Sequence, residues 1–190
     1  MSVGVEVRRA TPADSAVLAE VAAATFALAC PPRITQQAID TFIADVLSVE
    51  CFDGYLADPQ RDLFLSVEVS GEVSVDGSVD GGTTTGYAMV VNGEPTDPDV
   101  QSALTVRPTA ELSKIYVLPD HHGAGTSRLL MEAAIDAAQT RGAEAVWLGV
   151  NQENERAQKF YAKSGFTRVG TKRFLVGDRY EHDYVFERVL

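Results

Sequence analysis

The order of apolar and polar positions predicts strands and helices packed around one core. Short runs that alternate apolar with polar residues, or are almost wholly apolar, predict strands, whereas apolar positions three or four apart predict helices. Pro31 and Pro32 end the first helix, and Gly142 and Gly165 end two later ones. The pattern predicts strands at residues 5–9, 63–69, 86–91, 111–118, 145–150, 166–176 and 180–189, and helices after Thr11, after Thr35, at about 125–141 and at 155–163.

Two polar segments between these elements predict loops. Residues 70–85 nearly repeat Val, Ser, Asp and Gly, and we expect a flexible hairpin insertion there rather than a linker between domains. Residues 92–108 hold three prolines and several acids and also predict a loop. A chain of 190 residues is long enough to bury one core, so we expect residues 1–190 to form a single domain with an α+β or mixed α/β layer fold.

The charge balance narrows the classes of partner. The formal net charge is −11, from 16 basic and 27 acidic side chains, which disfavours nucleic acid and favours cationic small molecules. The same excess of acid is also explained by solubility alone. The first residues lack the basic and apolar regions of a signal peptide, and we find no apolar run near the roughly 18 residues that span a bilayer. We therefore expect a cytoplasmic protein that does not bind membranes.

The cysteines and histidines do not predict a metal site. Cys30 and Cys51 lack the short spacing of zinc ligands, and we interpret them as reduced thiols. The three histidines, His121, His122 and His182, do not form a ligand set with them. We expect no metal.

A glycine-containing turn at residues 119–127 is the first candidate site. A strand leads into it and a helix leaves it, so backbone N–H groups around Gly123 and Gly125 would converge with the positive end of the helix. This arrangement is typical of an anion site such as one for a pyrophosphate. Two familiar phosphate motifs fit poorly. A Walker loop needs Lys followed by Ser or Thr where this chain has Thr126, Ser127 and Arg128, and a dinucleotide fingerprint needs a third glycine that this turn lacks. A small-residue turn that only packs the helix against the strand is the structural alternative.

A second motif lies downstream on the predicted helix at 155–163. Asn154, Ala157, Phe160, Tyr161, Gly165 and Phe166 stand at the spacing Asn-x-x-Ala-x-x-Phe-Tyr-x-x-x-Gly-Phe. Together with the glycine turn, this segment resembles the GCN5-related N-acetyltransferase superfamily (GNAT) over residues 109–189. The chain departs from the family pattern at two positions of the turn, where His122 replaces Gln or Arg and Ser127 replaces Gly or Ala.

The resemblance implies a fold and a cosubstrate. The implied fold is a central, mostly antiparallel twisted sheet of about seven strands flanked by about four helices. The implied cosubstrate is acetyl-CoA, whose pantetheine arm would lie along the strand and whose pyrophosphate would sit over the turn. The implied binding residues are Ile115, Tyr116, Val117 and Leu118 on the strand, His122, Gly123, Ala124, Gly125, Thr126 and Ser127 in the turn, and Asn154, Tyr161 and Lys163 downstream.

Two residues are candidates for the chemistry of acetyl transfer to a primary amine. Tyr161 would give a proton to the departing CoA sulfur, or else it is an aromatic that packs beside Phe160. Glu111 would take the proton of the amine, or else it is an ordinary strand-end acid. Strand alternation places Glu111 on one face with Ser113, Ile115 and Val117. Lys163 would help to hold phosphates, or else it is a surface charge.

The sequence is compatible with several acceptors and with more than one oligomeric state. The segment from Gly165 to Gly170, the residues at 174–178 and Asp183 are similar to a bacterial spermine/spermidine acetyltransferase branch of the family. That similarity implies a small cationic amine or polyamine as acceptor. The alternatives are a peptide or protein N-acetyltransferase, a non-catalytic sensor that binds acyl-CoA, and an acyl donor longer than acetyl. Pairing of terminal strands between two chains would give a homodimer.

Overall fold

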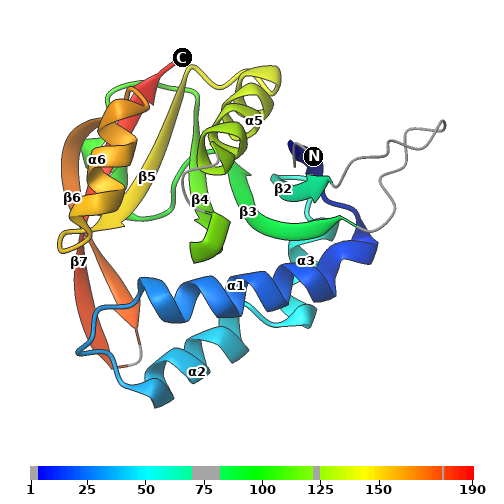
Figure 1. Cartoon of the computed structure of the whole chain (residues 1–190). Coiled ribbons are helices and arrows are strands. Elements are labelled where there is room, and N and C mark those ends of the chain that lie inside the picture. The colour runs from blue at the N-terminus through cyan, green and yellow to red at the C-terminus, as the bar shows by residue number, and fades with distance from the viewer. Residues whose placement is uncertain (1–3, 70–81, 122–124, 177) are drawn as a thin grey trace.

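The structure, a computed structural model, describes residues 4–69, 82–121, 125–176 and 178–190. Its centre is a seven-stranded sheet in the order β1-β2-β3-β4-β5-β7-β6 (Figure 1). All neighbouring strands are antiparallel except β4 and β5, which run parallel and confirm a mostly antiparallel sheet. The strands are β1 (Gly4–Arg9), β2 (Arg61–Val69), β3 (Thr83–Asn92), β4 (Thr109–Val117), β5 (Ala145–Asn151), β6 (Thr167–Val176) and β7 (Arg179–Val189), and the α-helices are α1 (Ser15–Ala29), α2 (Gln36–Val46), α3 (Val49–Ala57), α4 (Pro98–Ala103), α5 (Thr126–Thr140) and α6 (Glu155–Lys163).

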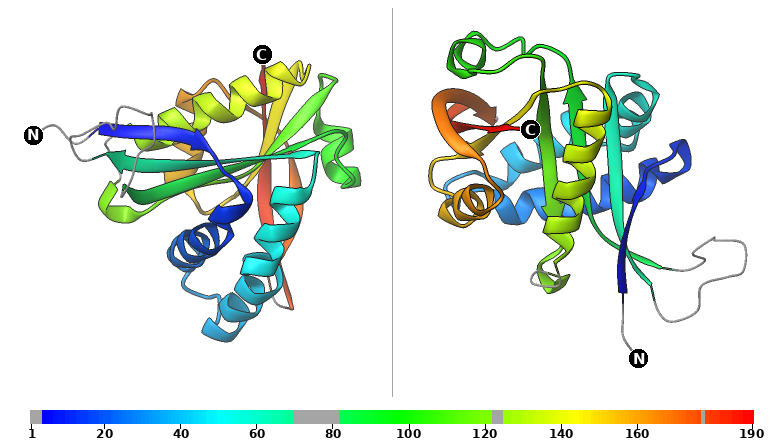
Figure 2. Two further views of the ribbon diagram at one scale, coloured as in Figure 1. Left: turned by 90° about the vertical axis from the view of Figure 1, so that its right-hand side faces the viewer. Right: turned by 90° about the horizontal axis from the view of Figure 1, so that it is seen from above.

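Helices cover both faces of the sheet. One face packs against α5 and α6, where Leu130, Ala134 and Ala138 meet Leu112 and Leu148. The other face packs against α1, α2 and α3, so that the sheet lies between the two helical layers (Figure 2). A smaller cluster, Val100 and Leu104 with Trp147 and Val185, covers the β5–β7 part of this second face. The fold is therefore a three-layer α/β arrangement, as the pattern predicted.

The start of α1 follows the predicted signals. The backbone N–H and the hydroxyl of Thr11 both donate to Asp14 Oδ2, at 2.7 and 2.9 Å, and Pro12 opens a single 3-10 turn before α1. The prediction that no apolar run could span a membrane was wrong for this segment. Residues 12–29 have a mean hydropathy of 1.3 over 18 residues, so by length and composition alone this segment could cross a membrane. Leu18 and Ala22 are fully buried in the core, and core helices pass the same test.

Short helices account for the main errors in the sequence pattern. The prediction that residues 92–108 form only a loop was wrong, because α4 lies within them. Asp97 caps α4 by accepting from the N–H groups of Asp99 and Val100, and Pro98 occupies its first position. The helix α3 was not predicted at all, although Ser48 caps it in the same way. Both helices are too short to show a clear helical period of apolar residues. Each is held in place by one buried apolar side chain, Val100 in α4 and Phe52 in α3.

The predicted insertion is shorter than expected on its C-terminal side. The structure places Thr83, Thr84 and Thr85 in β3 rather than in a loop, because β3 pairs with β2 from Thr83 onward. Thr85 is buried there, and its hydroxyl lies 3.0 Å from the Ser66 hydroxyl. Residues 70–81 of the predicted insertion lie outside the described residues.

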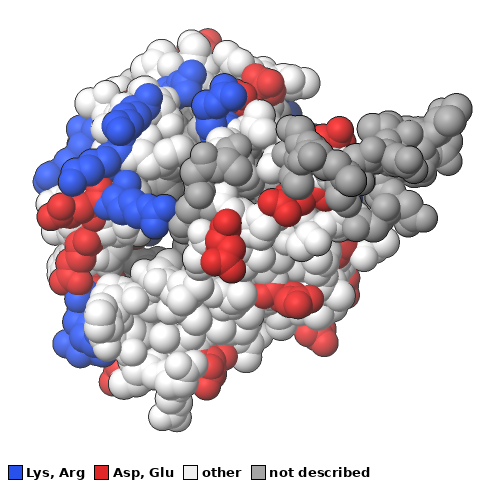
Figure 3. Space-filling model, in the orientation of Figure 1, with Lys and Arg blue, Asp and Glu red and all other residues white. Residues whose placement is uncertain are grey.

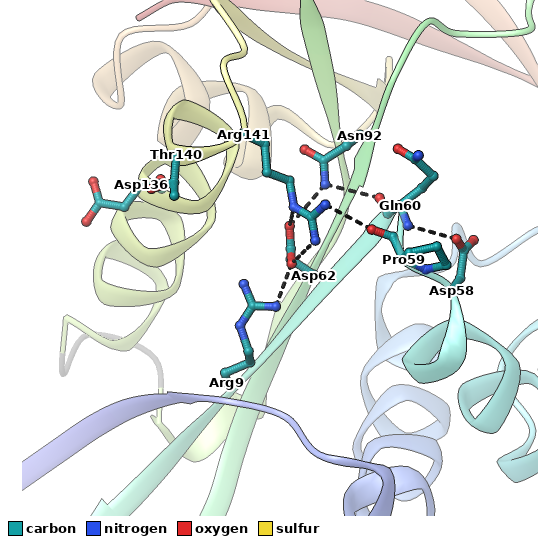
Figure 4. A network of polar contacts seen from close by, with 9 residues as sticks. All are labelled: Arg9, Asp58, Pro59, Gln60, Asp62, Asn92, Asp136, Thr140 and Arg141. Carbon is teal, nitrogen blue, oxygen red and sulfur yellow. Dashed lines mark hydrogen bonds and ion pairs between the residues drawn. The ribbon is translucent and has the colours of Figure 1, made fainter.

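A buried carboxylate joins four elements at the end of the sheet opposite the glycine turn. Asp62 on β2 is fully buried and accepts from Arg9 on β1, Arg141 after α5 and Asn92 on β3 (Figure 4). Burial by itself would raise the pKa of Asp62, but the donors outweigh it and hold the pKa below its usual range. The network fixes the C-terminal end of α5 against the sheet, and thereby the direction in which the other end of the helix points.

Candidate active site

The parallel strands β4 and β5 form a fork at the centre of the sheet. They pair only at Thr109, Ala110 and Glu111, opposite Ala145, Val146 and Trp147. Beyond Glu111, β4 runs from Leu112 to Tyr116 without a strand partner on its β5 side among the described residues. At about 3.3 Å per residue this free edge is about 16 Å long. Those of its backbone N–H and C=O groups that point away from β3 can pair with an extended ligand that lies in the fork like an added strand.

A bulge at the mouth of the fork changes which side chains share a face. Met89 of β3 faces Lys114 and the next residue, Val90, faces Leu112, so Ser113 is the extra residue in β4. Beyond the bulge, Ile115 and Val117 join Leu112 in the core under α5. The prediction that Glu111 shares a face with Ile115 and Val117 was therefore wrong. Glu111 lies on the opposite face, toward α1–α3, with Lys114 and Tyr116.

The helix α5 begins at a glycine in the left-handed region. Gly125 has φ +79°, a conformation that side chains rarely adopt, and it stands directly before the first residue of α5. Thr126 is buried, and its hydroxyl has no hydrogen-bond partner among the described residues. Ser127 follows in the first turn, where backbone N–H groups lack helical partners. His122, Gly123 and Ala124 lie outside the described residues, so the cradle is described only from Gly125 onward.

The motif on α6 places one tyrosine in an aromatic cluster. Asn154 caps α6 by accepting from the N–H of Ala157 at 3.1 Å. The ring of Tyr161 packs against Phe166 and Phe186, with ring centres 6.0 and 6.5 Å away. Burial, reinforced by the Tyr116 phenol, raises the pKa of Tyr161 well above its usual value. Tyr161 therefore carries its proton throughout the neutral pH range.

Charged side chains line a pocket on the α3 side of the fork. The pocket has a volume of about 400 Å³, and Tyr55, Arg61, Glu94, Glu111, Lys114 and Trp147 are among its lining residues. Burial raises the pKa of Glu111, and the nearby cations of Lys114, Lys172 and Arg61 offset part of that rise. Burial lowers the pKa of Lys114, and Glu111 opposes the change. An acid and a base thus face one pocket, each destabilised in its charged form.

A second buried pair lies farther along the fork. Lys172 of β6 reaches across β7 to Gly149 of β5, where an added Cβ would lie 2.5 Å from the Lys172 Cε. Its ammonium is 3.9 Å from Asp183 Oδ2, whereas Asp183 Oδ1 has no hydrogen-bond partner among the described residues. Burial raises the pKa of Asp183, which Lys172 partly offsets. Sequence reasoning noted Asp183 as part of the similarity to the spermine/spermidine acetyltransferase branch, and it did not identify Lys172 or Gly149.

The predicted residues of β4 and Leu118 lie on both faces of the sheet at this fork. Ile115 and Val117 face α5, while Tyr116 and Leu118 face α1, so the strand residues line both sides of the free edge. Lys163 lies exposed at the end of α6, and Figure 3 shows Lys and Arg side chains gathering over this part of the surface. Sequence reasoning missed Lys114 and Trp147. A lysine and a single tryptophan within strongly apolar strands were the signals that could have identified them.

Among the described residues, no group of three or more His, Cys, Asp or Glu is placed to hold a metal ion.

The model of the Acetyltransferase (GNAT) family matches residues 41–166. The chain belongs to this family. The GNAT chain is also 42% identical to uncharacterized N-acetyltransferases of Mycobacterium tuberculosis and Mycobacterium bovis over 177 residues, which cover 93% of this chain and 98% of each relative. It is accordingly an acyltransferase with the general N-acetyltransferase activity of the GNAT kind.

Solved structures of other GNAT proteins share the fold. The PaiA N-acetyltransferase of Thermoplasma acidophilum, in complex with coenzyme A, has a TM-score of 0.71 and 18% identity, covering 98% of this chain and 99% of that one. The spermidine/spermine N-acetyltransferase SpeG of Vibrio cholerae has a TM-score of 0.59 and 16% identity, covering 97% and 92%. Such low identities show the fold alone. The polyamine branch is thus not confirmed, and SpeG is a distant structural neighbour.

Proposed function

We propose that this GNAT enzyme transfers an acetyl group from acetyl-CoA to the primary amine of a small molecule that is cationic in solution. The observation that carries the proposal is the fork. One side of the parted strands offers a free β4 edge that leads to the N-terminus of α5, and the other side opens on a pocket that holds Glu111. The two reactants would approach from opposite sides and meet at the bulge.

The residues present fit acetyl-CoA. The free β4 edge suits the amide-bearing pantetheine arm, and the start of α5 at Gly125 suits a pyrophosphate because its N–H groups lack helical partners. The buried hydroxyl of Thr126, which has no partner in the part of the chain that the structure describes, is a further donor at the same place. Basic side chains over α6, among them Lys163, would contact the phosphate group of acetyl-CoA that is not part of the pyrophosphate. Bound acetyl-CoA supplies the activated acetyl thioester.

Tyr161 would supply a proton when the thioester bond breaks. Because burial keeps its pKa high, the phenol stays protonated at neutral pH and can donate a hydrogen bond. The departing CoA sulfur is negatively charged, and a hydrogen bond or proton from the phenol stabilises it. A backbone N–H near Val117 would hold the thioester oxygen as its negative charge develops. The Asn154 contact to the pantetheine arm stays a prediction, since its Oδ1 already accepts from Ala157.

Glu111 would take the proton of the attacking amine. The carboxylate faces the pocket at the last paired rung of the fork, so it lies beside the point where the strands part. Burial raises its pKa, which brings the carboxyl closer to the range in which a general base works. An amine arrives protonated, and a carboxylate both attracts the ammonium and accepts its proton.

A diamine or polyamine is the acceptor class that the C-terminal similarity predicts. The acidic surface, with a net charge of −11, favours any cationic acceptor over an anionic one. A sensor that binds acyl-CoA without turnover would not need a protonated Tyr161 beside the fork or a base in the facing pocket. Pairing of two chains and a cytoplasmic location stay predictions. The exposed Leu175 and Tyr180 on the β6–β7 hairpin offer one surface for such pairing.

Calorimetry with acetyl-CoA, followed by thiol release against a panel of amines, tests the proposal. Gly125→Ala and Gly142→Ala are a matched pair, because the two glycines lie at opposite ends of α5 with φ +79° and +87° and with open space where a Cβ would be added. Both variants should lose about 1–2 kcal/mol of stability to backbone strain. Only Gly125→Ala should weaken acetyl-CoA binding, by about tenfold or more. Equal binding by the two variants, or no binding by the wild type, would refute the phosphate site.

A further inference from the structure

The C-terminal part of the chain is basic, although the protein as a whole is acidic. Residues 155–190 hold eight of the 16 basic side chains but only five of the 27 acidic ones. Their net charge is therefore +3, whereas residues 1–154 carry −14. Figure 3 shows Lys and Arg side chains gathered on the side of the molecule where α6 and β6 lie. A surface that differs in sign from the rest of the molecule attracts partners that the rest repels.

Strand alternation divides the charges of the β6–β7 hairpin between its two faces. The acids Glu181, Asp183 and Glu187 share one face of β7, where each is only 4–6% exposed. The face toward α6 carries no acidic side chain among the described residues of the two strands. We call its outer part the basic face, which consists of Arg168, Thr171, Arg173 and Leu175 of β6 with Tyr180, His182 and Tyr184 of β7. All of these side chains are exposed except Tyr184, which is half-buried.

Two arginines of the basic face lie over tyrosine rings rather than beside acids. The Cζ of Arg168 is 3.5 Å from the centre of the Tyr184 ring, and that of Arg173 is 4.8 Å from the centre of the Tyr180 ring. Neither guanidinium makes an ion pair within 4 Å with any residue that the structure describes. A ring beneath a guanidinium holds it in place and leaves its N–H groups to bind a carboxylate in pairs.

The basic face borders a free edge of the sheet. The strand β6 is the last in the sheet, and the described part of the chain supplies no strand beyond it. An extended segment can pair with such an edge, and its alternate side chains then lie on the basic face. Because a bulge at Val169 takes up one residue, Arg168 and Arg173 are four strand steps apart, or about 13 Å. Two carboxylates four residues apart in an extended segment have the same spacing and the same side.

We infer that the basic face and the β6 edge dock an extended acidic segment of a partner protein, with its carboxylates on Arg168 and Arg173. The inference goes beyond the proposed function, because the surface lies outside the fork and the acceptor pocket. A long polyanion such as a nucleic acid would extend over the acidic remainder of the molecule. A second copy that paired its own β6 here across a two-fold axis would bring the arginines of both copies onto one continuous face.

A labelled peptide of about eight residues that alternates Glu and Thr is the probe. Fluorescence anisotropy is measured at low salt with wild-type enzyme and saturating CoA, which occupies the cofactor site. We expect a Kd below about 100 µM, and at least tenfold weaker binding of the same peptide with Gln in place of Glu. No binding of the acidic peptide, or binding only when CoA is absent, would overturn the inference.

Three arginine variants separate the basic face from charge in general. Arg168→Gln and Arg173→Gln should each weaken peptide binding by about tenfold, because each removes one charge-assisted contact. Arg179→Gln is the matched control, since Arg179 is exposed on the opposite face of the same hairpin and its replacement removes the same charge. We expect less than a twofold effect there. Equal losses in all three variants would show attraction by net charge alone and would overturn the docking surface.

The other occupants give different results in the same experiments. Tighter binding of single-stranded RNA than of the acidic peptide would overturn the inference in favour of a nucleic acid. A wild-type dimer in sedimentation velocity that Arg173→Gln dissociates would overturn it in favour of a second copy. Calorimetry with acetyl-CoA should give the same affinity for all three variants, so failure of the docking surface and failure of the proposed function are distinguishable.

Discussion

Replacing Asp62 by asparagine tests the network that anchors α5. The Asp62 carboxylate is fully buried, and it lies 2.6 Å from Arg9 Nη1, 2.7 Å from Arg141 Nε and 3.0 Å from Asn92 Nδ2. Asparagine is nearly the same size but has no charge and accepts through one oxygen only. At the other oxygen position its NH₂ group would face donors that remain in place.

The expected loss of stability on Asp62→Asn depends on how exposed its two arginine partners are. Removing one member of a fully buried ion pair costs about 3–5 kcal/mol. Here the arginine side chains are 59% and 38% exposed, so water recovers part of the loss. We expect Asp62→Asn to lower the free energy of unfolding at pH 7 by about 2–3 kcal/mol, or the midpoint temperature by about 5–10 °C.

The pH dependence of this loss has a defined sign. The donors hold the pKa of Asp62 below its usual range, so the carboxylate contributes stability above the unfolded pKa of about 4 and loses it as the pH falls. The difference between wild type and Asp62→Asn should therefore shrink as the pH drops below about 4.

Urea unfolding at several pH values measures the effect, and Asp136→Asn on the exposed side of α5 is the control, with an expected change within about 0.5 kcal/mol. A loss below about 0.5 kcal/mol for Asp62→Asn at pH 7, or one that does not vary with pH, would refute this account of the network.

Three further predictions concern the fork. Tyr161→Phe should lower turnover by about 100-fold while calorimetry finds acetyl-CoA affinity nearly unchanged, and normal turnover would exclude the acid role. Glu111→Gln should lower kcat/KM by about 100-fold at pH values above the pKa of Glu111 and remove the acid limb of the pH–rate profile. Because burial raises that pKa, the wild-type carboxylate loses stability as the pH rises through it, so urea unfolding of Glu111→Gln at pH 7 should show no loss. Gly149→Ala should displace the Lys172 ammonium, since the new Cβ would lie 2.5 Å from Lys172 Cε. Lys172 lowers the pKa of Glu111 and Asp183, so the acid limb should move to higher pH, and an unmoved limb would contradict this role.

Local signals were sufficient for the order of elements and for the two motifs. Thr35 and Asn154 cap their helices through their own side chains, and Gly142 and Gly165 adopt positive φ at the ends of α5 and α6. These features depend on hydrogen bonds and torsion angles within a few residues, so the sequence alone determines them. The same holds for Tyr161, whose place in its motif was visible before the fold was known.

Tertiary structure decided how the chemistry is arranged. The bulge at Ser113 moved Glu111 to the face opposite Ile115, and a shift of one residue in register is enough to do so. Pairing at the last rung set Trp147 beside Glu111, and the packing of β6 brought Lys172 across Gly149. These contacts join segments that are distant in the chain, and their register depends on the packing of the whole sheet. The sequence by itself therefore determined the kind of enzyme, whereas only the fold determined the pocket that we propose for the acceptor.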